Sequence, residues 1–339
     1  MPRRRRTASA VLAVLLVALP LSILLATTLG AARIPLATSV RALFAPSSLD
    51  AAAATQRLIV HEIRLPRLLL ACLIGSALAV AGTAMQGLFR NPLASPYVLG
   101  VASGASTGAS LALVNGWRPI PFLPLAAFIG GLAAVSIAYG LSSRRDHRTS
   151  VFTLILGGVA IGALFSAVTS FLVFLSSSGE RMTDIVFWIM GGLGRADWMA
   201  VPVVAAVVVP TAGAMFLLAP DLNALAMGEE AAFHLGVNAQ RTKRWALLLA
   251  TAATSASVAF AGTIGFVGLV IPHVMRLLIG PDHRVLLPAS ALAGAIFLIW
   301  ADVVARTAMR PVELPVGIVT AFLGAPFFLY LLRTRGRLL

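Results

Sequence analysis

Residues 65–88 read LPRLLLACLIGSALAVAGTAMQGL, an apolar run in which Arg67 is the only charged side chain. A helix that crosses a lipid bilayer needs about 20 mostly apolar residues. The run is long enough for this purpose, so it predicts a membrane-spanning helix. The same pattern recurs along the chain.

The composition of the whole chain agrees with a membrane location. Of its 339 residues 59% are hydrophobic and only 11% are charged, and the mean hydropathy is +0.94. A soluble domain cannot hide so much apolar surface. We therefore predict an all-α integral membrane protein, a single domain over residues 1–339 with about ten spans. The other nine apolar blocks are 8–30, 96–114, 121–141, 151–175, 199–218, 244–264, 268–280, 285–305 and 315–332.

The basic residues indicate orientation. The net charge is +14, but the arginines lie between apolar blocks, so we expect contact with lipid headgroups and no nucleic acid. The run after Arg3–Arg6 is too long for a typical signal peptide, and we interpret it as an uncleaved first span. With alternating spans, about 16 of the 26 basic residues fall on the side of the N-terminus. This bias predicts that both termini are cytoplasmic.

Residues 220–238, PDLNALAMGEEAAFHLGVN, depart from the membrane pattern. We expect a helix over 222–227 that Asp221 caps and Gly228 ends, and a second short helix that Gly236 ends. Neither is long enough to span a bilayer. Their apolar residues predict a face for a partner protein on the cytoplasmic side, and an interfacial helix on lipid is the alternative.

Several longer motifs follow one another along the chain. They are Arg64-Leu-Pro-Arg67, Gly82-Thr-Ala-Met-Gln86-Gly-Leu-Phe-Arg-Asn91-Pro92-Leu93-Ala-Ser-Pro96, Leu225-Ala-Met-Gly228-Glu229, Gly265-Phe-Val-Gly268-Leu-Val-Ile-Pro272-His273-Val-Met-Arg276, Asp282-His283-Arg284, Ala301-Asp302-Val-Val-Ala-Arg306 and Glu313-Leu-Pro315-Val-Gly317. In this order they resemble the FecCD family, the permeases of type II ABC importers for iron–siderophore, haem and cobalamin, and the cobalamin permeases are close.

The resemblance implies an assembly. A homodimer of ten-span subunits would carry the pathway on its two-fold axis in the bacterial inner membrane. It would work with two cytoplasmic ABC ATPase subunits and a periplasmic substrate-binding protein. The chain has no G-x-x-x-x-G-K-[ST] loop, which is the element that cradles nucleotide phosphates. We therefore expect no cofactor and no catalysis here, with ATP and Mg used by the partner ATPase.

The resemblance also implies roles for individual residues. Those expected to dock the binding protein are Arg64, Arg67 and Arg306, with headgroup anchoring as the alternative. Those expected to couple to the ATPase, within 221–238, are Asp221, Asn223, Leu225, Gly228, Glu229, Glu230, Leu235 and Gly236. Those expected at the pathway or its inner gate are Gln86, Asn91, Leu93, Ser150 and Phe152, and the family pattern is shifted around the last two.

Two other classes of function fit the sequence less well. A proton- or sodium-coupled secondary transporter places acids inside the membrane, whereas Asp302 and Glu313 lie near span ends, where Arg306 can pair with Asp302. A membrane enzyme or a metal site needs clustered ligands or bases, and the five histidines are scattered. The cargo stays open between siderophore, haem and cobalamin, with an iron chelate favoured.

Overall fold

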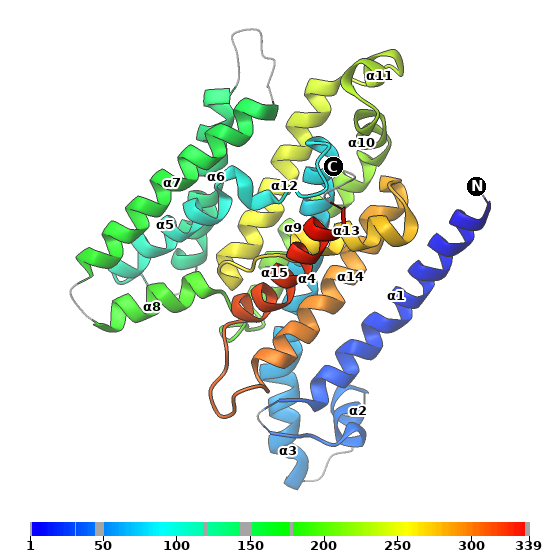
Figure 1. The fold of residues 1–339 in the computed structure, drawn as a ribbon. Helices are drawn as coiled ribbons and strands as arrows, with labels where there is room; N and C mark the ends of the chain where they lie inside the picture. Colours follow the sequence, from blue (N-terminus) through cyan, green and yellow to red (C-terminus); the bar gives the residue numbers. More distant parts are fainter. Residues whose placement is uncertain are drawn as a thin grey trace.

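The computed structural model describes residues 2–30, 32–44, 51–117, 121–142, 151–176 and 179–335, and in these ranges the regular structure is entirely helical (Figure 1). The elements are α1 (Pro2–Thr28), α2 (Leu36–Phe44), α3 (Ala51–Leu58), a π-helical turn (Ile59–Arg64), α4 (Leu65–Leu88), a 3-10 turn (Pro96–Leu99), α5 (Val101–Val114), α6 (Phe122–Ser142), α7 (Val151–Leu175), α8 (Gly179–Met190), α9 (Ala200–Leu217), α10 (Ala219–Ala226), α11 (Glu229–His234), α12 (Ala239–Ala261), α13 (Val267–Ile279), α14 (His283–Ala305) and α15 (Val316–Arg335).

The predicted spans are confirmed. Seven of the described helices are long and apolar enough to cross a membrane, and α5, α13 and α15 are shorter apolar helices. The apolar block at 244–264 lies largely in α12, a helix that begins earlier, at Ala239. Asn238 caps it, its side-chain oxygen accepting a hydrogen bond from the Arg241 amide at 3.0 Å. Hydropathy misses this turn because it is basic.

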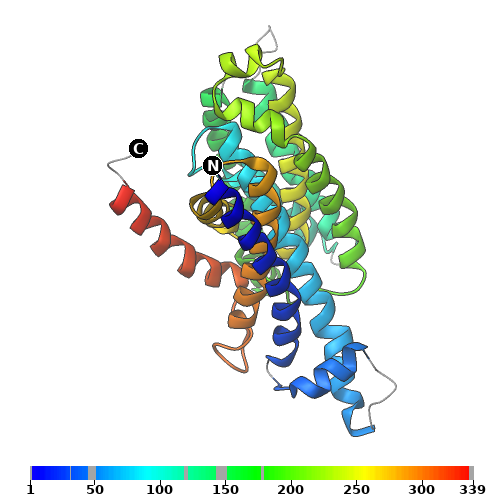
Figure 2. The ribbon, with the colours of Figure 1, turned by 90° about the vertical axis from the view of Figure 1, so that its right-hand side faces the viewer.

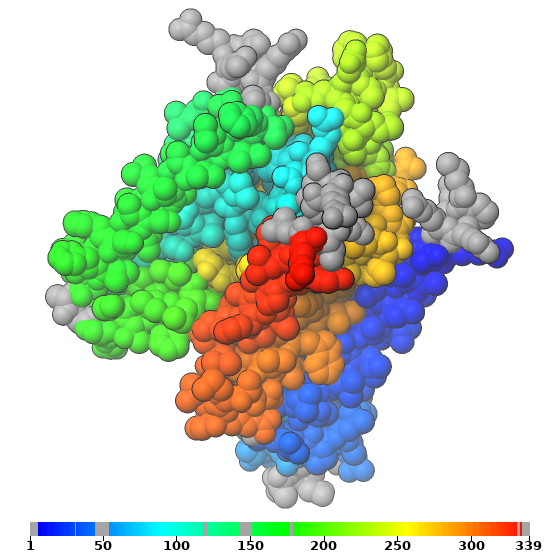
Figure 3. Space-filling view, in the orientation of Figure 1, coloured from blue at the N-terminus to red at the C-terminus, as the bar shows by residue number. Residues whose placement is uncertain are grey.

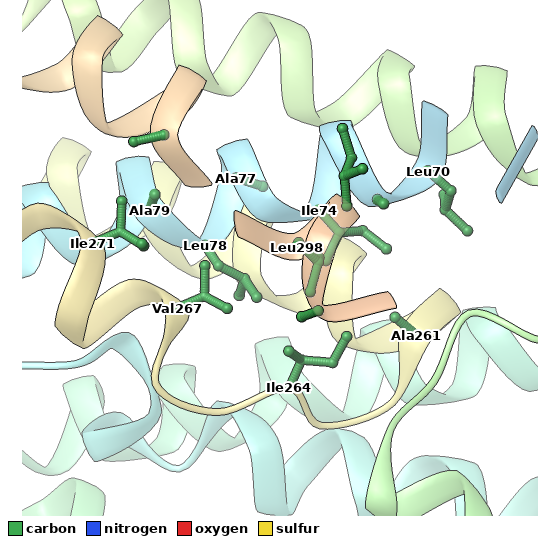
Figure 4. Packing of buried hydrophobic residues seen from close by; sticks show 14 of the residues in the cluster. Leu70, Ile74, Ala77, Leu78, Ala79, Ala261, Ile264, Val267, Ile271 and Leu298 are labelled. Atoms are coloured by element: carbon green, nitrogen blue, oxygen red, sulfur yellow. The ribbon is translucent and has the colours of Figure 1, made fainter. Parts of the chain in front are cut away.

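Helix α4 lies at the centre of the bundle. It packs against α9, α12, α13 and α14, and its apolar residues are covered nearly all round. Figure 4 shows Ile74 and Leu78 of α4 beside Leu298 of α14 and Val267 of α13. A helix that is apolar on every side is stable only in such surroundings. Residues 65–88 are therefore the core of the protein, and other helices separate them from lipid.

Close approach of helix backbones depends on glycine. A Cβ built on Gly75 of α4 would lie 2.2 Å from the carbonyl oxygen of Gly294 on α14. A second such contact joins α5 to α6, where a Cβ on Gly104 would lie 2.3 Å from the Gly130 carbonyl oxygen. Small residues let helices approach closely in lipid. The glycines thus set the spacing of both helix pairs.

The two ends of the bundle carry different structures. Helices α10 and α11 lie at one end, and α2 and α3 lie at the other (Figures 1 and 2). Helix α1 stands at the edge, with outward apolar residues such as Val14 and Val17 exposed. Helix α15 crosses the front of the molecule over α14 (Figure 3). The bundle therefore has an apolar middle section, and its two ends carry different helices.

Replacing Gly75 by alanine should lower the free energy of unfolding by about 1–3 kcal/mol, the usual cost of overpacking. The added methyl group would clash with backbone of α14, which no side-chain rotation can relieve. Thermal unfolding of the purified protein in detergent would measure the change.

Gly213→Ala on α9 is the matched control, because nothing lies within 4 Å of a Cβ built there. That variant should be neutral, or more stable by about 0.5–1 kcal/mol through higher helix propensity. Equal losses for the two variants would contradict the role given to the Gly75 contact.

Candidate functional site

Three arginines predicted for docking meet at the end of the bundle that holds α2 and α3. Arg64 and Arg67 stand where α4 begins, and Arg306 follows the last residue of α14. Because α4 and α14 are antiparallel neighbours, the start of one meets the end of the other. We call Arg64, Arg67, Arg306, Asp302 and Glu313 the arginine cluster.

Arg67 is the centre of the arginine cluster. Its Nε donates a hydrogen bond to Asp302 Oδ1 at 2.8 Å, and its Nη1 donates to Glu313 Oε2, also at 2.8 Å. Arg306 Nε lies 3.3 Å from Asp302 Oδ2, one helical turn away. This confirms the predicted pairing of Asp302 with Arg306. Burial lowers the pKa of the Arg306 guanidinium, and the Asp302 carboxylate opposes part of that shift.

The other contacts of the arginine cluster hold the end of α1. Arg64 donates to the backbone carbonyls of Thr27 and Ala32. Arg306 Nη2 donates to the Ala26 carbonyl at 2.9 Å. As a result the exposed fractions of Arg64, Arg67 and Arg306 are only 4%, 7% and 5%. The structure gives these three side chains partners within the chain, and docking of a binding protein remains a prediction.

A cavity of about 600 Å³ opens beside the arginine cluster. Arg67 and Glu313 line one side of it, and Trp188, Asp184 and Arg195 line another. Arg195 and Asp184 form an ion pair at 3.9 Å, and Trp188 is 8% exposed. These last three residues were not predicted as a site: Asp184 and Trp188 lie on α8, an amphipathic helix too short to be a span, and Arg195 lies in the loop after it.

At the opposite end, α10 and α11 form the hook predicted over 221–238. The predicted start of the first helix is wrong: it runs over Ala219–Ala226, with Pro220 in its first turn and Asp221 inside it instead of capping it. Gly228 and Gly236 do set the bends, with φ of +121° and +77°. The structure thus confirms two short helices but moves the first of them.

The apolar residues of the hook divide into two groups. Leu222 and Leu225 are buried, the latter with Ala232 in a small core between the two helices. Met227, Phe233 and Leu235 are 63%, 76% and 61% exposed. Leu225 therefore supports the hook from within, whereas the exposed trio forms an outward apolar surface. We call these three the hook surface.

Polar contacts hold the hook to the spans. Lys243 of α12 pairs with Glu229 at 2.5 Å, and Thr242 Oγ1 donates to Asp221 Oδ2 at 3.2 Å. Glu229 and Glu230 are both exposed. The hook is therefore fixed to the first turn of α12.

A second set of contacts joins the hook to α14. Asn223 Nδ2 donates to Asp282 Oδ1 at 2.7 Å, and Asn223 Oδ1 accepts from the His283 amide at 2.8 Å. Asp282 in turn caps α14 by accepting from the Arg284 amide. The sequence signal for this network was the Asp282-His283-Arg284 motif, to which sequence reasoning had assigned no role.

The predicted gate residues are spread over this end. Gln86 is buried, and its Nε2 donates to the Leu269 carbonyl of α13 at 3.0 Å. Asn91 is exposed and accepts a hydrogen bond from the Leu93 amide in the loop after α4. Phe152 is 75% exposed at the start of α7, and Ser150 lies outside the described residues. The structure does not bring these residues into one constriction of the single chain.

Removing one charge from the arginine cluster should be costly. Asp302→Asn would leave Arg67 and Arg306 buried without their shared carboxylate, and we expect a loss of about 3–5 kcal/mol in the free energy of unfolding. Glu313→Gln is the matched control, because the Glu313 side chain is 46% exposed and such pairs contribute about 0–1 kcal/mol. Chemical denaturation in detergent would compare them, and equal losses would contradict the central role of Asp302.

Comparison with known proteins places this geometry in a family. Residues 15–334 match the FecCD transport family. The chain is 48% identical over 282 residues to the cobalamin import system permease protein BtuC of Halobacterium salinarum, covering 83% of this chain and 75% of that one. It is 45% identical over 276 residues to the hemin transport system permease protein HmuU of Yersinia pestis, covering 80% and 82%.

A solved structure agrees with the sequence match. A metal-chelate type ABC transporter in an inward-facing conformation superposes with a TM-score of 0.86 and 31% identity, covering 96% of this chain and 99% of that chain. The fold, the order of the helices and the sequence therefore all indicate the same family. The chain is a multi-pass membrane protein that belongs to the FecCD transport family.

Proposed function

We propose that the chain is the membrane-spanning subunit of an ATP-driven importer that moves a large metal chelate from the periplasm to the cytoplasm. The observation that carries the proposal is the exposed hook surface, Met227, Phe233 and Leu235, in the segment of α10 and α11 at one end of the bundle (Figure 1). An exposed apolar patch at the polar end of a membrane protein marks a partner site. We propose an ATPase as the partner, because the chain superposes on an ABC transporter and has no phosphate-binding loop of its own.

The contacts of the hook give coupling a physical route. A force on α10 and α11 reaches α12 through Lys243 and Thr242, and reaches α14 through Asn223. Helix α14 ends in the arginine cluster at the far side of the bundle. Movement of two ATPase subunits, one on each hook of a homodimer, would thereby be carried across the membrane.

The arginine cluster is proposed to receive the periplasmic binding protein. Arg64, Arg67 and Arg306 outnumber the carboxylates of Asp302 and Glu313, and opposite charge on a partner speeds encounter and fixes register. Because all three arginines already have partners in the chain, docking requires the acids of the binding protein to act at longer range or to exchange with these partners. With the arginine cluster on the periplasmic side, both termini lie in the cytoplasm, on the same side of the membrane as the hook.

The pathway is proposed to lie between two copies of the chain. Asn91 and Leu93 stand at the hook end of α4, where an inner gate on the dimer axis would be, with Gln86 one turn earlier and Phe152 contributing from the start of α7. Ser150, also expected at the gate, lies outside the described residues. For the cargo, the two permease relatives are named for cobalamin and hemin, and the solved transporter for metal chelates. We propose that the cargo is an iron chelate, either a siderophore complex or haem, with cobalamin as the alternative.

A secondary transporter is less well supported by the geometry. A proton or sodium carrier needs a carboxylate in the membrane that can change its charge state or its ligands. The buried Asp302 carboxylate lies between Arg67 and Arg306, so both of its oxygens already face a guanidinium within the chain. The described residues also contain no group of three or more His, Cys, Asp or Glu arranged to hold a metal ion.

The hook surface provides the decisive test. Phe233→Glu should weaken association with the cognate ATPase by about tenfold or more, because loss of a well-placed aromatic contact typically costs 2 kcal/mol or more. Phe233→Leu keeps an apolar side chain and should bind nearly as well. Co-purification and titration in detergent measure both variants. Unchanged association of Phe233→Glu would reject the hook as the coupling element.

The purified chain alone should not hydrolyse ATP, and reconstituted transport should need the separate ATPase. A phosphate-release assay on the lone chain and on the reconstituted complex would check this. Turnover by the lone chain, or uptake driven by an ion gradient without any ATPase, would favour the secondary transporter.

A further inference from the structure

A cavity at the hook end of the bundle has no role in the proposed function, although Gln86, Asn223 and Met227 line it. It has a volume of about 730 Å³ and lies between the end of α4, the hook and the loop that joins α13 to α14, with Ala8 of α1 at its edge. Gln86, Arg90, Arg276, Asn223 and Asp282 supply its polar lining. We call it the α13 pocket. Its volume is in the range of sites that hold small molecules.

Buried polar atoms without partners gather at the α13 pocket. Among the residues that the structure describes, nothing hydrogen-bonds to Nε or Nη2 of Arg276 or to Oε1 of Gln86, and all three atoms are buried. His283 Nε2, which packs against Gly87 in the pocket wall, is also without a partner in the described part of the chain. Buried polar groups are nearly always hydrogen-bonded. Such a concentration indicates a polar ligand.

The charge of the α13 pocket selects an anion. Arg276 and Arg90 bring two guanidinium groups to it, and Arg90 stands on the loop side with its side chain exposed. Asp282 is the one acid among the pocket's lining residues, and its carboxylate already accepts hydrogen bonds from Asn223 Nδ2 and the Arg284 amide. A guanidinium matches the oxygens of a phosphate with two parallel hydrogen bonds. The chemistry therefore favours a phosphate group.

The surroundings of the α13 pocket favour a lipid as the source of the phosphate. Leu277 and Leu278, next to Arg276 on α13, are 44% and 54% exposed. These residues offer acyl chains an apolar flank beside the charged pocket. Basic pockets between spans on the cytoplasmic side bind phospholipid headgroups.

We infer that the α13 pocket is a binding site for a phosphate group, with Arg276 as its principal ligand and Arg90 as the second. An anionic phospholipid and free phosphate share this chemistry, and the lipid is the source that the apolar flank favours. Because Arg90 also lies near Gly228 of the hook, a bound phosphate would brace the hook against α13.

Binding is tested on the full chain, delipidated in detergent, with three probes. These are dioleoylphosphatidylglycerol, dioleoylglycerol with the same chains but no phosphate, and inorganic phosphate. Native mass spectrometry counts bound lipid, and thermal unfolding measures stabilisation. We expect phosphatidylglycerol to bind and stabilise, and dioleoylglycerol to do neither. Stabilisation by inorganic phosphate that depends on Arg276 would identify free phosphate as the source, whereas an effect of the lipid alone would identify the headgroup.

Variants connect binding to the pocket. Arg276→Gln should weaken phosphatidylglycerol binding at least about tenfold, as expected for loss of a charge-assisted hydrogen bond, and Arg276→Lys should weaken it less. Arg284→Gln is the matched control, an exposed arginine on α14 that does not line the pocket. If Arg276→Gln does not fold, Arg90→Gln takes its place, because the exposed Arg90 side chain is not needed for packing.

Three outcomes would overturn the inference. The first is equal loss of binding in the pocket variant and in Arg284→Gln, which would indicate general attraction by surface charge. The second is binding of dioleoylglycerol as tight as that of phosphatidylglycerol. The third is that Arg276→Gln weakens association with the ATPase while leaving lipid and phosphate binding unchanged, which would make Arg276 a protein contact.

Discussion

The guanidinium of Arg67, held between Asp302 and Glu313, joins the start of α4 to the end of α14 and to the loop that follows it. The same carboxylate of Asp302 faces Arg306, which with Arg64 holds the last turn of α1 and the residues after it. A buried ion pair is favourable only when its charges are well paired. The packing of this end of the bundle therefore depends on one carboxylate, Asp302, which Arg67 and Arg306 share.

The packing of α4 against α14 also determines how the core is filled and how the hook is connected to the spans. The glycine contact at Gly75 and Gly294 brings the two helices close, and the apolar residues of α4 fill the space between α14, α12 and α13. At the far end, Asn223 connects α14 to the hook. The two proposed partner sites thus lie at opposite ends of one closely packed helix pair, with little backbone freedom between them.

The sequence predicts the fold well because membrane spans are set by local composition. Ten apolar blocks and a hook of two short helices with bends at Gly228 and Gly236 are visible without any knowledge of contacts, and the structure has them all. The basic first turn of α12 was missed because hydropathy does not register a capped polar turn. The pairing of Asp302 with Arg306 was predictable because the two residues are one helical turn apart.

What sequence reasoning could not give are features set by contacts between distant residues. Arg67 and Asp302 are 235 positions apart, so nothing local indicates that the docking arginines are buried. The division of the hook into buried Leu225 and exposed Phe233 likewise depends on how α10 and α11 fold on each other. The α13 pocket also draws its residues from segments spread over most of the chain.

The ion pair between Lys243 and Glu229 has a consequence for chemical labelling. Lys243 is the only lysine in the sequence, and it is largely buried where the hook meets α12. An amine-selective reagent therefore has a single lysine to modify, located where the hook contacts α12. The rate at which Lys243 is modified would report how often its ion pair with Glu229 opens, without any engineered probe.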